Sequence, residues 1–441
     1  MTVHKADASP PKEFFVNMIT KDITIEDAIL DLLDNSLDGA RKVLYQKNGQ
    51  KPVIDDYNGF EAHLHLDSNN FSIEDNCGGI SISDAIDYAF HFGRRPDAPD
   101  GEYAIGVYGI GMKRAMFKMG RAIHIHSSNE KEAFTCDIDV DQWLAEPNNW
   151  EIELEDAALI KESGTIIKVS RLLDSVSEIY SDMTFINELT RIVARDYAVF
   201  LDKGFRIFIN GEKVHGYKYA VKESDDFEPH RYSYEDEGVQ VEILAGMTAS
   251  PPDEIDPTEH GFVRTGAEYY GWFVLCNDRV VLAANKNGRT VWGNGGFPIW
   301  HPQFNGFTGM AIFHSTNPNA LPWTTTKRDV DESSPIYRRA VAQMKRATKP
   351  WIEYTNQRKS DIDEAKRREA SAKAISLFSV NRDSEFKLPK SPGRPKLATI
   401  SYKRERDEVR NVAKALGNEN MSYKNVGSKT FDYFVENELE D

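Results

Sequence analysis

Asp31-Leu-Leu-Asp34-Asn35-Ser-Leu-Asp38 is the stretch from which the fold of this chain can be worked out. It lies in an expected helix that runs from Ile25 to about Tyr45, after Thr24 as the cap residue. Its polar residues, with Asp27, recur every third or fourth position and share one face, and leucines flank that face. Unpaired carboxylates beside apolar surface are costly, so the pattern favours a bound metal ion or ligand. An ordinary amphipathic surface helix is the alternative.

Two glycine-containing segments follow in the chain. The first, Asp75-Asn-Cys77-Gly78-Gly79-Ile80, ends an expected strand. A carboxylate there can accept a hydrogen bond from an exocyclic amine, and the glycines let a flat base approach the backbone. The alternative for this segment is an ordinary turn.

The second segment is Gly106-Val107-Tyr108-Gly109-Ile110-Gly111-Met112-Lys113, ahead of a helix expected to begin near Arg114. Backbone N–H groups and a helix N-terminus together favour a phosphate. The segment lacks the Gly-Lys-Ser/Thr of a Walker loop and does not directly follow a strand, which excludes the two commonest nucleotide-binding loops. Ser163-Gly164-Thr165 begins a further expected strand.

In this order, over residues 14–170, these segments resemble the GHKL superfamily, named for gyrase, the large heat-shock chaperones, histidine kinases and MutL. The resemblance implies an α+β fold with a Bergerat-type α/β sandwich, in which helices cover one face of a mixed sheet. It implies ATP as substrate and Mg²⁺ as cofactor. It also implies that Asn35 is the metal ligand, Asp31 the general base and Asp75 the residue that reads adenine.

The same resemblance extends to the rest of the nucleotide site. Residues 106–113 are expected to hold the phosphates and residues 91–108 to form a lid over them. Asp38, Gly79 and Ile80 complete the expected contacts, and Thr165 is expected near a water bound to adenine.

The chain departs from the family pattern at two positions. Asp31 stands where the family has Glu, and its shorter side chain predicts slow hydrolysis. Cys77 replaces the first glycine of Asp-x-Gly-x-Gly, which predicts a tighter or shifted turn.

Residues 1–171 are therefore expected to form the ATP-binding domain, and residues 172–350 a transducer-like α+β domain. The second domain should contain a helix at Met183–Leu201, a strand at Phe205–Ile209 that turns at Asn210-Gly211, and further strands near residues 239–245, 271–275 and 280–283. It resembles the transducers of the chaperone, MutL and MORC branches. That resemblance implies a loop cation on the γ-phosphate, and Lys327 in Leu321-Pro-Trp-Thr-Thr-Thr-Lys327-Arg-Asp is the candidate. A surface lysine is the alternative.

The remaining chain divides by composition. Helix is expected over residues 335–378, with a charged helical segment at 351–385. A Pro/Lys-rich linker follows at 386–397, and a small C-terminal segment at 398–441.

Charge is distributed unevenly along the chain. The 54 basic and 70 acidic residues give a net charge of −16, but residues 341–410 contain 18 Lys/Arg against 10 Asp/Glu. A DNA partner would have to bind this basic region; a solvated helix and linker is the alternative. The three cysteines are unpaired in spacing, and no signal peptide or membrane-spanning run is seen, so a cytoplasmic protein without a membrane partner is expected.

The leading hypothesis is an ATPase whose ATP-bound state closes as a homodimer and acts on DNA as MORC or MutL proteins do. One alternative is a chaperone-like machine for protein clients, and another is a nucleotide-gated binding module with little hydrolysis. A histidine kinase is disfavoured, because no phosphoacceptor histidine on a helical hairpin precedes the ATP site.

Overall fold

The computed structural model describes residues 11–47, 56–92, 105, 109–252, 266–381, 383–389 and 400–439. The chain separates into two compact units, Met1–Ser391 and Pro392–Asp441. The first unit contains two main sheets and their helices, and the second contains a pair of helices. No helix among the described residues combines the length and apolarity that a membrane span requires.

The first sheet has eight strands in the order β5-β4-β3-β6-β2-β1-β7-β8. Neighbours are antiparallel except for β1 and β7, which are parallel. In β1, Leu64 and Leu66 are buried while His63 and His65 are exposed, so one face of the sheet is covered there. The strands are β1 (Glu61–Leu66), β2 (Asn70–Asp75), β3 (Gly120–Ser128), β4 (Ala133–Asp139), β5 (Glu155–Asp156), β6 (Gly164–Leu172), β7 (Arg206–Ile209) and β8 (Glu212–Lys213).

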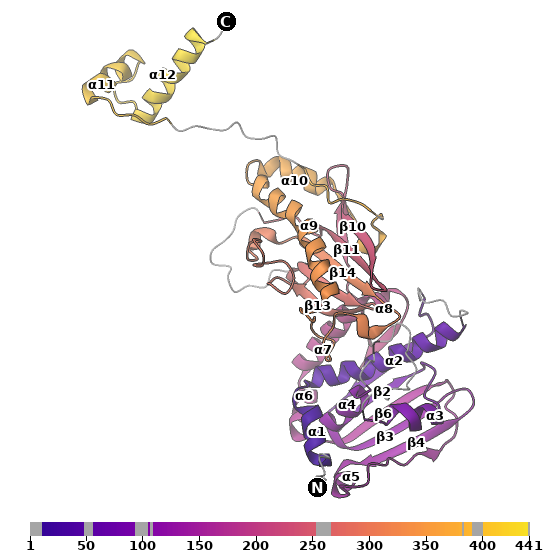
Figure 1. The fold of residues 1–441 in the computed structure, drawn as a ribbon. Helices are drawn as coiled ribbons and strands as arrows, with labels where there is room; N and C mark the ends of the chain where they lie inside the picture. The colour runs from indigo at the N-terminus through magenta and orange to yellow at the C-terminus, as the bar shows by residue number, and fades with distance from the viewer. Residues whose placement is uncertain are drawn as a thin grey trace, which may run out of the picture. The chain divides into compact units, whose positions relative to one another are not determined.

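Helices α1 (Lys12–Lys21), α2 (Ile25–Lys47) and α4 (Gly111–Met119) pack together beside this sheet (Figure 1). The predicted cap of α2 is confirmed, because the Asp27 backbone N–H donates to Thr24 Oγ1 at 3.1 Å. Ile29, Leu33 and Leu37 of α2 are fully buried in the core. The hydrophobic spacing of this helix therefore fixed its orientation on the sheet.

Further helices connect these elements: α3 (Ile82–Asp84), the π-helix η1 (Ala85–Ala89), α5 (Val140–Ala145), α6 (Asp174–Ser181), α7 (Met183–Asp196) and α8 (Ala198–Asp202). The helix expected at 183–201 is thus interrupted at Tyr197, whose backbone leaves the helical region at φ −110° and ψ 15°.

The second sheet has five strands in the order β10-β11-β14-β12-β13, and only its β12–β14 pair is parallel. Helix α9 (Pro335–Arg358) packs on β11 and β14, and Trp351 of this helix is fully buried. The strands are β10 (His230–Asp236), β11 (Val239–Met247), β12 (Gly271–Cys276), β13 (Arg279–Asn285) and β14 (Phe307–His314). Single 3₁₀ turns lie at η3 (Ala267–Tyr269), η4 (Pro302–Phe304), η5 (Pro318–Ala320) and η6 (Leu377–Ser379).

Two segments differ from the sequence expectation. The strand assigned to the second domain, β7, pairs with β1 and so lies in the first sheet; its hairpin turn at Asn210-Gly211 is confirmed by positive φ angles at both residues. The helical region after α9 ends with α10 (Ile362–Ser371). Beyond it, β15 (Lys373–Ser376) pairs with β9 (Ala220–Glu223), because tertiary pairing outweighs helix propensity there.

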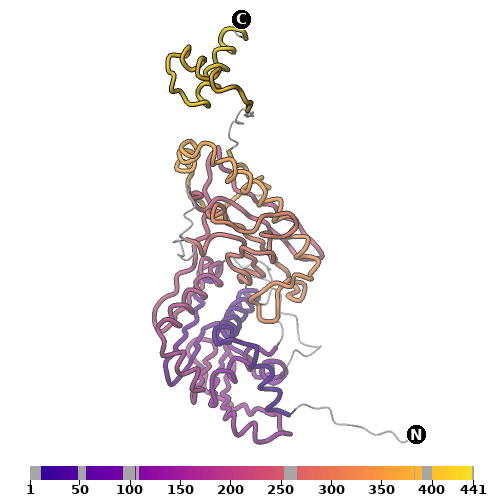
Figure 2. Tube along the Cα trace, turned by 90° about the vertical axis from the view of Figure 1, so that its left-hand side faces the viewer, coloured from indigo at the N-terminus to yellow at the C-terminus, as the bar shows by residue number. Residues whose placement is uncertain are grey.

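The second unit consists of α11 (Arg406–Ala415) and α12 (Tyr423–Glu438), which lie side by side in both views (Figures 1 and 2). Ala413 and Val426 are its buried side chains among residues 400–439. The hairpin therefore has a very small core of its own.

Candidate functional site

The acidic residues of α2 lie in three different environments. Asp31 and Asp34 are buried, Asp38 is half-buried and Asn35 is exposed. The Asn35 side chain makes no hydrogen bond to the described residues, whereas Asp38 accepts one from the Ile105 backbone N–H at 2.7 Å. The polar face of α2 that the sequence predicts is therefore partly buried in the core and partly exposed on the surface.

Asp31 is held by helix α4. The Arg114 guanidinium contacts Asp31 Oδ2 through Nε at 2.7 Å and through Nη2 at 2.6 Å. The first residue of α4, Gly111, also lies against Asp31, since a Cβ on it would come within 3.3 Å of the carboxyl carbon. Burial raises the pKa of Asp31, while Lys327 and Arg114 counteract this by favouring the charged form.

Asp34 is the centre of a larger buried cluster. It accepts hydrogen bonds from Lys327 Nζ at 2.9 Å, from the Tyr197 hydroxyl at 2.7 Å and from Arg279 Nε at 3.2 Å. Arg279 also pairs with Asp196 at 3.1 Å and stacks on the Tyr197 ring. Although burial alone would raise it, these cations hold the pKa of Asp34 below its ordinary value.

Lys327 stands between the two carboxylates. Its Nζ is 3.6 Å from Asp31 Oδ1 and 2.9 Å from Asp34 Oδ2, and its side chain is buried. Lys327 closes a tight turn in which its N–H donates to the Thr324 carbonyl at 2.9 Å, and its φ of 54° lies in the left-handed region. The loop from the second domain therefore places this cation on α2, rather than leaving it as a surface lysine.

These contacts correct one inference from the sequence. We expected a metal ion or ligand to offset the cost of the acidic face, but Arg114, Lys327 and Arg279 already do so for Asp31 and Asp34. The three cations come from distant parts of the chain, so the helix sequence alone contains no sign of them.

The hairpin between β12 and β13 also fixes α2 to the second sheet. The turn between β12 and β13 has positive φ at both Asn277 and Asp278, as a two-residue hairpin requires. Arg41 of α2 donates to the Asn277 carbonyl at 2.7 Å and lies 3.5 Å from the Asp278 carboxylate. Asp278 also contacts Lys203 and His314, each at 2.9 Å.

Asp75 lies beside α2 at the end of β2. Its carboxylate accepts hydrogen bonds from the Ser36 hydroxyl at 2.7 Å, the Cys77 N–H at 2.9 Å and the Thr165 N–H at 3.3 Å. Thr165 is the residue opposite Asp75 in the β2–β6 register. Burial raises the pKa of Asp75, although these donors favour its charged form.

The turn after Asp75 is tightly packed. Gly79 has a φ of 68°, and a Cβ there would lie 2.1 Å from the Ser128 carbonyl, so only glycine is tolerated. The Ile80 N–H donates to Ser127 Oγ at 2.8 Å, and Ser127 lies 2.8 Å from Thr165 Oγ1. Ser127 thus connects two residues that the sequence assigned to the nucleotide site.

The expected phosphate loop is described from Gly109 onward. Helix α4 begins at Gly111, earlier than expected, and Ile110 before it provides no side-chain cap. An uncapped helix N-terminus next to glycines is a suitable anion site. Gly106, Val107 and Tyr108, and residues 93–104 of the expected lid, lie outside the described residues.

Lys113 connects the two ends of the expected lid. Its Nζ donates to the Ala89 carbonyl at 2.7 Å, to His91 at 2.8 Å and to Gly109 at 2.5 Å. Burial lowers the pKa of Lys113 to about 7. The Gly109 contact places the amine close to the N-terminus of α4. With a pKa of about 7, the amine changes its protonation state near neutral pH.

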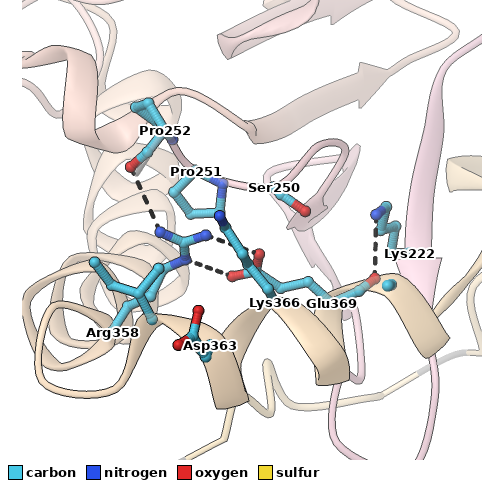
Figure 3. Close-up of a pocket in the computed structure, with 10 residues that line it drawn as sticks. Lys222, Ser250, Pro251, Pro252, Arg358, Asp363, Lys366 and Glu369 are labelled. Carbon is cyan, nitrogen blue, oxygen red and sulfur yellow. Dashed lines mark hydrogen bonds and ion pairs between the residues drawn. The ribbon is translucent and has the colours of Figure 1, made fainter. Parts of the chain in front are cut away.

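A separate cavity of about 1090 Å³ lies in the second domain, lined by α10 and the segment after β11. Figure 3 shows Arg358 pointing toward the Glu369 carboxylate and the Pro252 carbonyl. Glu369 is bound by Arg358 at 2.7 Å and by the Tyr354 hydroxyl at 2.5 Å. This buried pair fastens α10 to α9.

The sequence analysis missed several residues of the site: Ser36, Arg114, Ser127, Tyr197 and Arg279. Arg114 follows Lys113 directly, and that basic pair was the one local signal. Nothing near Arg279 or Tyr197 in the sequence indicates a carboxylate on α2.

Residues 23–171 match the sequence model of the family described as histidine kinase-, DNA gyrase B-, and HSP90-like ATPase. This segment contains the acidic residues of α2, the Asp75 turn, the Lys113 loop and Thr165. No curated protein matches the chain. Residues 23–171 are therefore similar to an ATPase domain of this GHKL type, and the match ends before Lys327.

Proposed function

We propose that this protein binds ATP with Mg²⁺ and hydrolyses it slowly, and that its second domain responds to the nucleotide. One observation carries the proposal: Asp31, the uncapped start of α4 and the Asp75–Thr165 pair converge around α2, within the segment that matches an ATPase family.

The residues present fit a magnesium ion. Asn35 offers an amide oxygen that no other described residue binds, four residues after Asp31 and three before Asp38 on the same helix. Bound there, Mg²⁺ would neutralise charge on the phosphates. The N–H groups at the start of α4 would bind the phosphate oxygens, and Lys113 would release one of its three carbonyl partners to join them.

Hydrolysis requires a base and a cation near the γ-phosphate. Asp31 is the base in this proposal: it accepts a proton from the attacking water, and Arg114 holds its carboxylate in place. Lys327, 3.6 Å from Asp31, supplies positive charge where negative charge develops.

A nucleotide-gated binding module with little hydrolysis is the second candidate. The ion pairs of Asp31 favour this second candidate, because the Asp31 carboxylate contacts both Arg114 and Lys327. A base that is already paired must release a partner before it can bind water, which slows turnover.

Binding and turnover separate these two candidates. We expect wild-type protein and Asp31→Asn to bind ATP·Mg²⁺ by calorimetry, and only wild type to release phosphate. Asn35→Ala should lose magnesium-dependent binding, whereas Asn69→Ala, an exposed asparagine in the β1–β2 turn, should not. Phosphate release by wild type that is as low as that of Asp31→Asn would support the binding module. No ATP binding by wild type would refute both candidate functions.

The proposal also includes dimerisation in the ATP-bound state and binding to DNA. A chain shortened to residues 1–391 should change from monomer to dimer when a non-hydrolysable ATP analogue is added. Light scattering should then give twice the molar mass. An unchanged mass despite measured binding would exclude ATP-gated closure.

The basic region 341–410 is the proposed DNA surface. Its Arg358 is buried against Glu369, so DNA would meet exposed residues such as Lys349 and Arg367. Lys349→Glu with Arg367→Glu should lower DNA affinity and reduce its salt dependence. If both stay unchanged, and a misfolded protein rather than DNA stimulates turnover, the chaperone-like alternative is supported instead.

A further inference from the structure

Helix α12 presents an aromatic face that its partner helix does not cover. Tyr423, Phe431 and Phe434 recur with Gly427 at helical spacing, so they share one side of the helix. Phe431 and Phe434 are 53% and 54% exposed, and Tyr423 is 70% exposed. Contiguous aromatic surface of this kind is costly in water and is typical of an interaction site.

The helix pair is too small to be stable through its own packing. Ala413 and Val426 are its buried side chains among residues 400–439, Leu416 and Met421 are half-buried, and the aromatic side chains of α12 face solvent. A unit of this size normally needs additional burial from a partner. The aromatic face of α12 is the surface available for it.

Charges on α12 are arranged against its own helix dipole. Lys424 and Lys429 lie in the N-terminal half, and Asp432, Glu436 and Glu438 in the C-terminal half. Cations near the N-terminus and anions near the C-terminus destabilise an isolated helix. None of these five side chains forms an ion pair with another described residue.

We propose that the aromatic face of α12 pairs with the same face of α12 from a second copy of the chain, in antiparallel orientation. Such a pair brings the basic half of each helix against the acidic half of the other. With the two-fold axis near residues 430 and 431, Lys424 of one copy lies next to Glu438 of the other, and Phe434 lies over Gly427.

Positions on the helix support this pairing. Lys424 and Glu438 are fourteen residues apart, nearly four full turns, so both border the aromatic face. At Gly427, the one atom of the described residues within 4 Å of where a Cβ would stand is the Tyr402 hydroxyl oxygen, at 3.9 Å. The face therefore has room for an aromatic ring from the other copy.

The charge balance disfavours a nucleic acid as the occupant. Helix α12 contains two lysines against three acidic residues, so this helix has no positive field to attract phosphates. A self-complementary surface with both charges at opposite ends is instead typical of a two-fold interface.

The first test is the molar mass of the full chain without nucleotide, measured by sedimentation equilibrium. Wild type should have twice the mass of one chain, and Phe431→Asp with Phe434→Asp should be monomeric with unchanged circular dichroism. The matched control is Leu159→Asp, an exposed apolar residue of the first unit, which should stay dimeric. A monomeric wild type, or a dimer that survives the double change, overturns the proposal.

The second test exchanges the charges. Lys424→Glu alone and Glu438→Lys alone should each weaken the dimer about ten-fold, because two symmetric ion pairs become repulsive. The double variant should regain wild-type affinity, as should an equimolar mixture of the two single variants. Failure of both rescues overturns the antiparallel arrangement.

This inference does not depend on the proposed ATP chemistry. The masses are measured without nucleotide, and ATP binding by calorimetry should be the same for wild type and for the α12 variants. Loss of ATP binding in wild type would refute the proposed function and leave the α12 interface standing.

Discussion

Arg114 and Asp31 form a buried ion pair at the proposed reacting end of the site. Both side chains are buried, and two guanidinium nitrogens lie within 2.7 Å of one carboxylate oxygen. Removing one member of a buried pair leaves an uncompensated charge, which is more costly than the loss of the contact itself.

Arg114→Met should therefore lower the free energy of unfolding by about 3 kcal/mol. Arg114→Met combined with Asp31→Asn should cost less than the sum of the single changes, because no charge is then left without its partner. Urea denaturation measures all three. Arg121→Met, which removes a partly exposed partner of Asp141, should cost under about 1 kcal/mol. Additive single effects would show that the two residues are not coupled.

In the proposed function, Lys113 makes nucleotide binding depend on pH. Its pKa is about 7 in this structure because the amine is buried. A bound phosphate favours the charged form, so binding above pH 7 should take up a proton, approaching one per nucleotide by pH 8.5. Calorimetry in two buffers of different ionisation enthalpy measures this uptake.

The affinity of the wild-type protein for the nucleotide should accordingly fall about ten-fold for each pH unit above 7. Lys113→Arg stays charged throughout this range and should bind without that loss or proton uptake. The same uptake in both proteins would assign the proton to another group.

At the scale of elements, α2 is held by the β12–β13 hairpin as well as by α4. Asp278 at the hairpin turn contacts Lys203, His314 and Arg41. Burial alone would raise the pKa of Asp278, but these neighbours hold it well below its ordinary value.

The stabilisation from Asp278 is therefore complete above the pKa of an unfolded aspartate, about 3.9, and is lost as pH falls below that value toward the lowered folded pKa. We expect Asp278→Asn to lower the free energy of unfolding by about 3 kcal/mol at pH 7. Urea midpoints of the two proteins should differ from pH 7 to 5, and the difference should shrink on further acidification. A difference that persists unchanged at pH 2 would contradict this account.

At the scale of the whole first unit, Lys327 connects the second domain to α2 at the proposed nucleotide site. It belongs to a loop that follows β14, yet its amine lies between Asp31 and Asp34 of α2. A change in the charge around Asp31 on nucleotide binding therefore acts directly on the second domain. This cation is the simplest route for coupling between the two parts.

Lys327→Ala should lower kcat by about 10²-fold, as expected when one electrostatic stabiliser is removed, with a much smaller change in nucleotide Kd. Lys327→Arg should retain part of kcat, and Lys349→Ala, an exposed lysine on α9, should change neither value. Steady-state phosphate release and calorimetry measure the two quantities. Equal losses in kcat and affinity would indicate that Lys327 holds the nucleotide in its ground state.

The sequence by itself determined the local elements of this protein. The Thr24 cap, the alternation of Leu64 and His65, and the Asn210-Gly211 turn depend on residues a few positions apart, so short-range rules suffice to predict them. The order of the acidic helix, the Asp75 turn and the Lys113 loop was likewise visible in the chain.

Only the tertiary structure decided which cation meets which carboxylate. Asp34 is 245 residues from Arg279 and 293 from Lys327, and Asp31 is 83 residues from Arg114. It also decided that β7 completes the first sheet and that residues 373–376 form a strand. Pairing of this kind depends on which surfaces the packed sheets and helices bring together in space, and no short stretch of sequence contains that information.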